Sequence, residues 1–355
     1  MKRNLAAAVL GAVALGSFVG ATGAEEIDPR VERALKRLES GDENARHNAA
    51  LDIVSAREKA ASALEEIMKA IARDDSPRVK RNLLRAVGYI GPKAEPAVGR
   101  VVAILKNAGE DVTVRAAAAF ALGKIGDAAA HTITDIVKAA RHHDRNVKQA
   151  ACRALGEFGP KAAEGVPAIV SVLSDGHVLT VRQAVVALGD IGPPAAKAAG
   201  PLKAKLAGAD ERMVKSIGLA LGKMGPKVSP TLLEGAASET ANVRAGCVLA
   251  LGCIRPADEK NVKAVIKATG DDDYLVKLCA LMGLERLGPA GAPAVGLLRK
   301  ALKADETEMR WRAASALGAI GPAAKEALDD LRKLVDDVDG RVGRSAARAI
   351  PKISE

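Results

Sequence analysis

Histidine is the residue type in this chain best suited to hold a metal or move a proton. The five histidines are His47, His131, His142, His143 and His177. None belongs to a His-Glu-x-x-His motif or to a histidine and cysteine cluster at metal-ligand spacing. The pair His142 and His143 falls in a polar stretch between two expected helices, where we interpret both rings as solvated. The histidines therefore predict no metal site.

Carboxylates and glycines offer the remaining routes to chemistry. The acidic runs 271–273 and 336–337 lack the alternating ligand spacing of a calcium loop, and helix starts explain them better. No glycine-rich phosphate loop follows a strand pattern. No serine, histidine and aspartate set can be nominated as a triad. We therefore expect no catalytic, cofactor-binding or metal-binding residues, and no cofactor.

The cysteines carry little information about function. Cys152, Cys247 and Cys279 fall in small-residue columns of expected helices, where a free cysteine packs as a small apolar side chain. Cys253 falls in an expected turn. Cys247 and Cys279 lie on neighbouring units of a repeat, so whether they pair stays open.

The glycines belong to a repeat that extends through most of the chain. A Leu-Gly-x-Ile-Gly-Pro-like string returns about every 33 residues. When the repeats are aligned, the leucine position of this string forms a column, called the leucine column below. It contains Val87, Leu122, Leu155, Leu188, Leu221, Leu251, Leu284, Leu317 and Ile350. Such a register predicts a solenoid in which each unit buries its apolar face only against its neighbours.

Each unit has the pattern of two helices. Val98, Val101, Val102 and Leu105 follow the i, i+3, i+4, i+7 stripe of an amphipathic first helix. The second helix is rich in alanine, and aspartates at 75, 111, 144 and 210 precede it as expected N-caps. We expect it to end in a left-handed cap at the glycine after each column leucine. These glycines are Gly88, Gly123, Gly156, Gly189, Gly222, Gly252 and Gly318.

The pattern V-R-x-x-A-x-x-A-L-G-x-I-G-P is matched over 114–126, 147–160 and 309–322. It resembles the short HEAT-like repeats of phycobilin-lyase-type proteins, and the resemblance runs from near residue 76 to the end. It implies an all-α fold, a right-handed α-α superhelix. It also implies a charge ladder between neighbouring repeats, here Asp75 with Lys80, Asp111 with Arg115, Asp144 with Lys148, and Asp272 or Asp273 with Lys277.

Two enzyme classes share this kind of repeat. Deoxyhypusine hydroxylase needs paired His-Glu motifs for a di-iron site, and this chain has no His-Glu dipeptide. Phycobilin lyases have no such signature, so a lyase-like chromophore-handling protein, or another enzyme built on HEAT-like repeats, remains the alternative function.

The first residues have the pattern of a secretory signal. Lys2 and Arg3 precede an apolar stretch over 5–19, and small residues end at Ala24. We expect cleavage after Ala24 and a periplasmic or secreted protein, with a retained membrane anchor as the lesser alternative. No later stretch is apolar enough for a transmembrane span. The expected organisation is a signal peptide over 1–24, a degenerate N-terminal capping repeat over 25–75, a repeat array over 76–340 and a C-terminal capping helix over 341–355.

The net charge of +10 is spread over every repeat, and only six residues are aromatic. Few aromatic side chains are therefore available for nucleic-acid bases to stack on, which argues against specific nucleic-acid binding. A protein or peptide partner is the better expectation.

One column of the second helices departs from the packing pattern. This column is the position two residues before the leucine in each second helix, where a polar residue is expected. In the middle repeats the residue at this position is apolar. The candidate partner-binding ridge is Val186, Leu219, Leu249, Met282, Arg310 and Trp311. If the second helices line the inner curve, the ridge is an exposed interface; otherwise it packs between helices. We therefore expect an exported, noncatalytic scaffold that binds a protein partner through its concave face.

Overall fold

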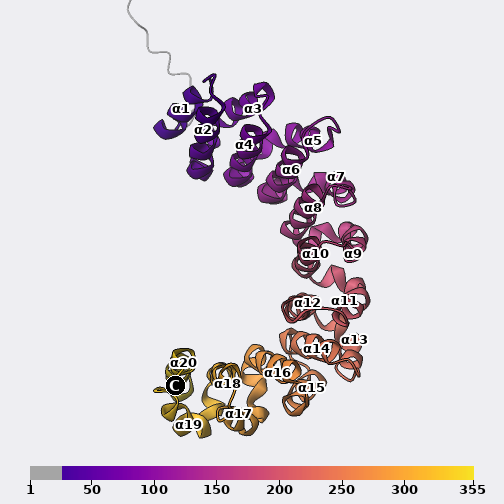
Figure 1. The fold of residues 1–355 in the computed structure, drawn as a ribbon, viewed down its shortest axis with the longest axis vertical. Helices are drawn as coiled ribbons and strands as arrows, with labels where there is room; N and C mark the ends of the chain where they lie inside the picture. Colours follow the sequence, from indigo (N-terminus) through magenta and orange to yellow (C-terminus); the bar gives the residue numbers. More distant parts are fainter. Residues whose placement is uncertain (1–25) are drawn as a thin grey trace, which may run out of the picture.

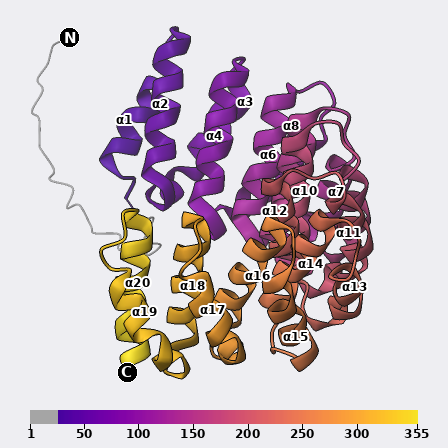
Figure 2. The ribbon, with the colours of Figure 1, turned by 60° about the horizontal axis from the view of Figure 1, so that its bottom comes forward.

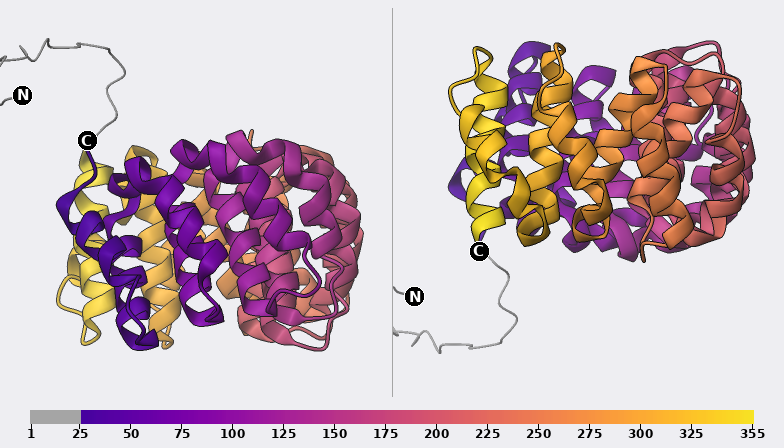
Figure 3. Two further views of the ribbon diagram at one scale, coloured as in Figure 1. Left: turned by 90° about the horizontal axis from the view of Figure 1, so that it is seen from above. Right: turned by 90° about the horizontal axis from the view of Figure 1, so that it is seen from below.

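The computed structural model describes residues 26–355, which fold into stacked pairs of helices. These residues contain twenty α-helices, nine short 3-10 helices and no strand. The pairs follow an open arc with α1 at one tip and α20 at the other (Figure 1). Figure 2 and Figure 3 show the helices side by side along this arc. The all-α solenoid is confirmed, whereas the expected signal peptide, 1–24, lies outside the described residues.

The odd-numbered helices form the outer layer of the arc and the even-numbered helices the inner layer (Figure 1). The outer helices are α1 (Pro29–Arg37), α3 (Leu64–Arg73), α5 (Val98–Lys106), α7 (Ile133–Ala139), α9 (Val166–Val172), α11 (Ala199–Leu206), α13 (Ser229–Gly235), α15 (Glu259–Lys267), α17 (Val295–Ala301) and α19 (Leu328–Lys333). The inner helices are α2 (Glu43–Ala56), α4 (Pro77–Ile90), α6 (Val112–Ile125), α8 (Arg145–Glu157), α10 (Val178–Ile191), α12 (Glu211–Lys223), α14 (Ala241–Cys253), α16 (Tyr274–Leu287), α18 (Thr307–Ile320) and α20 (Gly340–Ser354). The 3-10 helices are η1 (Arg57–Ala63), η2 (Gly91–Ala97), η3 (Gly126–Thr132), η4 (Gly159–Gly165), η5 (Pro193–Ala198), η6 (Pro226–Val228), η7 (Ala268–Gly270), η8 (Gly288–Ala294) and η9 (Gly321–Ala327).

The core is a continuous layer of apolar side chains packed between the outer and the inner helices. Leu122, Leu155 and Leu188 of the inner column are fully buried, as are Ile136 and Ile169 of the outer helices. Burying one such side chain contributes about 1.5–3 kcal/mol, so every repeat depends on its neighbour to cover this face.

Aspartate caps begin several inner helices, as the sequence predicts. Asp111 accepts a hydrogen bond from the Thr113 backbone N–H at 2.8 Å, and Asp210 accepts one from Met213 at 2.7 Å. Asp75 is an exception, because α4 begins one residue later and Ser76 caps it. These caps satisfy backbone donors that have no partner within the helix.

The glycine after the column leucine is not a left-handed cap, and that prediction is wrong. Gly189 lies inside α10, which continues through Ile191, and the left-handed residue is the next glycine, Gly192, with a φ of 73°. A Cβ atom on Gly189 would lie 2.9 Å from the Cα of Ala220 in α12. The glycine at this column therefore permits the close approach of adjacent inner helices.

A charge ladder links neighbouring repeats, but through partners other than those expected. Arg46 binds Asp74 at 2.9 Å, and the same contact recurs between Lys148 and Asp175 at 2.5 Å. It appears again as Lys80 with Glu110, Arg244 with Asp271 and Arg310 with Asp337. Each basic side chain thus reaches the loop of the following repeat. The expected pairs, such as Asp111 with Arg115 and Asp144 with Lys148, do not form among residues 26–355, because those aspartates accept backbone N–H groups as caps.

Candidate functional site

The predicted ridge lies on the inner layer, but its members differ in exposure. Val186 of α10 is 43% exposed, and Leu219 of α12 is partly buried. Met282 and Trp311 are partly buried as well, while Leu249 of α14 is completely buried. Among the apolar members of the ridge, Val186 is therefore the exposed one.

Leu249 is buried because α14 packs very closely against both of its inner neighbours. A Cβ atom on Gly218 of α12 would lie 2.8 Å from the carbonyl oxygen of Gly246, and one on Gly252 would lie 2.4 Å from the Cα of Gly283 in α16. Backbones at these separations leave no room for an exposed side chain between them. The expectation that Leu249 contributes to a surface is wrong.

Arg310 and Trp311 also have roles other than the expected hot spot. Arg310 donates to both carboxylate oxygens of Asp337, at 3.0 and 3.1 Å, and to the backbone carbonyls of the preceding loop. Its pKa is raised by the Asp337 hydrogen bond. The guanidinium of Arg312 lies 3.8 Å from the centre of the Trp311 ring. Arg310 therefore connects repeats, and Trp311 is partly covered by its own helix.

The start of α10 adds apolar surface that the sequence reasoning missed. Val178 is 50% exposed and Leu179 is 52% exposed. Leu179 precedes Val186 by two helical turns, so both side chains lie on one face. A signal was available: the equivalent positions of α8, Arg145 and Asn146, are polar. Large apolar residues at an exposed helix start are the pattern that could have indicated this site.

Next to Val186 lies a pocket of 490 Å³ between α10, α12 and the ends of α14 and α16. Its lining includes Val186, Leu219, Lys223, Cys253, Arg255 and Arg286. Lys223 binds Asp190 at 2.8 Å, and Arg255 donates to the carbonyl oxygen of Ile254 at 2.8 Å. Burial raises the pKa of the Cys253 thiol, which favours the neutral and weakly nucleophilic form. Apolar side chains line the bottom of the pocket and basic side chains surround its opening. This arrangement is suited to binding.

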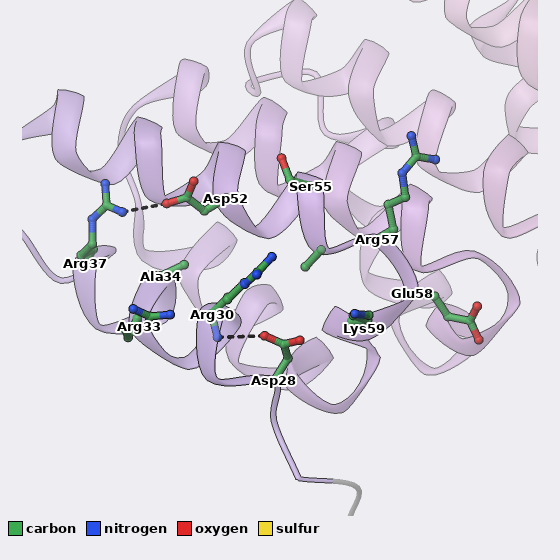
Figure 4. A pocket seen from close by; sticks show the side chains of 11 residues that line it. Asp28, Arg30, Arg33, Ala34, Arg37, Asp52, Ser55, Arg57, Glu58 and Lys59 are labelled. Carbon is green, nitrogen blue, oxygen red and sulfur yellow. Dashed lines mark hydrogen bonds and ion pairs between the residues drawn. The ribbon is translucent and has the colours of Figure 1, made fainter.

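A second hollow, of 830 Å³, lies at the N-terminal tip between α1, α2 and η1. Figure 4 shows Arg30, Arg33 and Lys59 around it, with Arg37 bound to Asp52. The Arg37 to Asp52 distance is 2.7 Å, and both side chains are about half exposed. These charges face water, and no general acid and base pair converges in the hollow.

One histidine and two cysteines occupy structural positions. His47 lies 3.0 Å from the amide nitrogen of Asn82, and burial lowers the pKa of its ring. Burial raises the pKa of Cys247 and of Cys279 to about 12, and both are free thiols. Over residues 26–355, no group of three or more His, Cys, Asp or Glu side chains could hold a metal ion. In the same range, no helix is long and apolar enough to cross a membrane.

Known structures share this architecture at low sequence identity. Yeast importin-beta (Kap95p) matches with a TM-score of 0.69 and 14% identity over 91% of this chain. The complex of Kap95 with Nup1 matches with a TM-score of 0.65 and 15% identity over 91% of this chain. This chain covers 50% of each of those proteins, about half their length. The likeness confirms the predicted fold class, the right-handed α-α superhelix.

Sequence comparison places the chain in a family. No curated protein matches it. A family model of HEAT repeats, however, matches residues 64–133, 99–164, 133–222 and 262–351, which together make up most of the chain. The chain belongs to the HEAT-repeat proteins.

Proposed function

We propose that this chain is an exported, noncatalytic scaffold that binds a protein partner through its concave face. HEAT-repeat structures of the same architecture include Kap95 in complex with Nup1 and Kap121p bound to Nup53p. An extended inner surface made of successive helices suits a partner segment that contacts several repeats. The inner helices of the described chain offer such a binding surface, which supports a scaffold.

The exposed apolar face of α10 is the observation that carries the proposal. Leu179 and Val186 expose about half of each side chain, and Val186 lines the pocket together with Leu219 and Lys223. Large apolar side chains on one face beside an open pocket are typical of protein interfaces. This surface replaces the longer ridge as the proposed contact.

The test compares two pairs of substitutions. Leu179→Asp with Val186→Asp places charges in the proposed interface, while Leu297→Asp with Val338→Asp changes exposed apolar residues elsewhere. Quantitative mass spectrometry would compare the proteins captured from the envelope fraction by each variant. We expect a specific partner to be lost from the first variant and retained by the second. The same captured proteins for all three forms, at unchanged melting temperatures, would exclude this face.

Export is the other part of the proposal. The basic start, the apolar stretch over 5–19 and the small residues before Glu25 support cleavage after Ala24. Residues 25–75 would then begin the mature protein as a capping repeat, and 341–355 would close the array. Mass spectrometry of protein from the envelope fraction should give an N-terminus at Glu25. Protein that retains Met1 in that fraction would contradict cleavage.

A further inference from the structure

Two arginines and two aromatic rings form a continuous row across the first repeats. The Arg57 guanidinium lies 5.3 Å from the centre of the Tyr89 ring, and Tyr89 meets Phe120 edge to face at 5.6 Å. The Arg153 guanidinium lies 5.2 Å from the centre of the Phe120 ring. Arg57 is the first residue after α2 and begins η1, and the other three residues come from α4, α6 and α8. The row therefore runs from the end of α2 across the next three inner helices.

The surface beside this row is positively charged. Arg81, Arg85 and Tyr89 are four residues apart on α4, so they share one face, and with Phe120 and Arg153 they line a pocket of 350 Å³. Arg85 donates to the amide oxygen of Asn82 at 3.4 Å. Within the described chain, no ion pair joins Arg57, Arg81 or Arg85 to a carboxylate.

Glu157, a carboxylate beside the row, is already engaged, and Asp111, whose pKa is lowered by the Thr113 hydroxyl and further by the charge of Arg81, forms no ion pair with that arginine among the described residues. Glu157 lies 2.5 Å from the ammonium of Lys124 and 3.8 Å from Arg153. The other arginines of the pocket have no such partner, so the surface carries excess positive charge. This differs from the ladder arginines Arg244 and Arg310 of the inner helices, which are paired with aspartates of the loops.

The backbone of Arg57 supports a role for its side chain. Among the described residues it is the only non-glycine residue with a positive φ, at 52°, and the equivalent turns have Gly91 at 73° and Gly126 at 71°. A non-glycine residue in this conformation is strained, and such residues concentrate at functional sites. Glycine would suit the turn better, but it would leave Tyr89 without its guanidinium.

We propose that this arginine–aromatic surface, made of Arg57, Arg81, Arg85, Tyr89, Phe120 and Arg153, binds an acidic segment of a protein partner. Carboxylates of the segment would pair with the free guanidiniums, which present planar donors that match them. The two rings hold the guanidiniums of Arg57 and Arg153 beside the other arginines of this surface. A flat membrane fits the inner side of an arc poorly, and both rings are already covered by arginines, which leaves little surface for stacking nucleic-acid bases.

The inference rests on the proposed protein-binding function and names the chemistry of a second contact. It can fail independently, because its surface is separate from Leu179 and Val186. The variant that carries aspartates at those two positions should still bind an acidic peptide through α4, α6 and α8.

The first experiment measures binding of a fluorescein-labelled poly-glutamate peptide to the full chain by anisotropy, with poly-lysine of equal length for comparison. The triple variant Arg81→Gln, Arg85→Gln, Arg153→Gln removes three positive charges from the surface. The matched control Lys197→Gln, Lys227→Gln, Lys267→Gln removes three exposed charges elsewhere. We expect poly-glutamate but not poly-lysine to bind. The first variant should weaken binding about tenfold, and the control less than about twofold.

The second experiment separates binding from folding. Arg57→Gly relieves the strained turn and removes one guanidinium, so we expect a melting temperature equal to or above that of the wild type together with weaker binding. A variant that is at least as stable and yet binds poorly cannot be explained by damage to the fold.

Four results would overturn the proposal. These are no binding of poly-glutamate, equal losses in the two triple variants, unchanged binding by Arg57→Gly, or tighter binding of poly-uridylate RNA or phosphatidylglycerol vesicles than of poly-glutamate. The last result would assign the surface to a nucleic acid or a membrane.

Discussion

At the scale of single residues, His142 occupies a position in the charge ladder that aspartate holds elsewhere. Asp175, Asp271 and Asp337 each bind the basic residue of the preceding inner helix. His142 instead lies 3.1 Å from Arg115 through Nε2, and its Nδ1 accepts the Asp144 backbone N–H at 3.0 Å. A neutral imidazole accepts at one ring nitrogen, here Nδ1, whereas a protonated imidazole accepts at neither and would add a positive charge beside Arg115. Burial, followed by the charges of Arg115 and His143, lowers the pKa of the His142 ring from 6.5.

This geometry predicts a loss of stability in mild acid. Because the folded pKa lies below the unfolded value, the stability that neutral His142 contributes is present above about pH 6.5 and is lost as pH falls through the folded pKa. His47, whose pKa is also lowered by burial, acts in the same direction. We predict that His142→Asp raises the melting temperature at neutral pH and makes its decline between about pH 6.5 and 5 shallower. His131→Asn, at an exposed histidine, is the control. Parallel curves for wild type and His142→Asp would contradict this role.

The sequence indicates which residues are charged but not which of them meet. The basic position of each second helix is recognisable, and the resemblance implies a ladder between repeats. Pairing a residue with the acid just before its own helix ignores the caps, which use that carboxylate first. The partner of Arg244 is 27 residues later, in the loop of the next repeat. Which loop residue comes within reach of the arginine depends on how far one repeat is rotated relative to the next. A single sequence does not encode that rotation.

At the scale of elements, helix pairs, caps and turns follow from the sequence, whereas the two glycines of each turn are hard to tell apart. Ile191 lies between Gly189 and Gly192 and stays helical, so the left-handed turn comes three residues later than predicted. Either glycine suits a left-handed cap when judged alone. Only the neighbouring helix shows that Gly189 is needed for its missing side chain.

Gly189→Val should therefore destabilise the solenoid through a clash between helices. The new side chain would begin 2.9 Å from the Cα of Ala220 and 3.0 Å from its Cβ. Overpacking of this kind costs about 1–3 kcal/mol, measurable by denaturant unfolding. Gly200→Val is the matched control, because nothing lies within 4 Å of a Cβ atom there. Equal midpoints for the two variants would show that α10 and α12 can separate at no cost.

At the scale of the whole molecule, the repeat period predicts a solenoid but not its curvature. The candidate ridge depends on second helices that line the inner curve with their side chains exposed, and Val186 is exposed there. The prediction is wrong at Leu249, where glycines let α12, α14 and α16 pack closely. The same packing brings the N-terminal ends of distant helices together: Lys215 of α12 lies 3.9 Å from Glu308 of α18. A contact between helices three repeats apart means that the arc bends tightly there.

This contact predicts that charge helps to set the shape of the arc. Glu308 lies 3.9 Å from both Lys215 and Arg312, and Arg312 lies 3.5 Å from Glu285. Such partly exposed pairs contribute less than about 1 kcal/mol each, so Glu308→Lys should barely change the melting temperature. A solenoid bends easily, however, because each repeat contacts only its neighbours. We therefore expect Glu308→Lys to increase the radius of gyration measured by X-ray scattering, and high salt to do the same to the wild type. Glu239→Lys, an equal charge change at an exposed loop residue, should leave the radius unchanged. If Glu308→Lys scatters like the wild type, the close packing of α12, α14 and α16 alone determines the curvature.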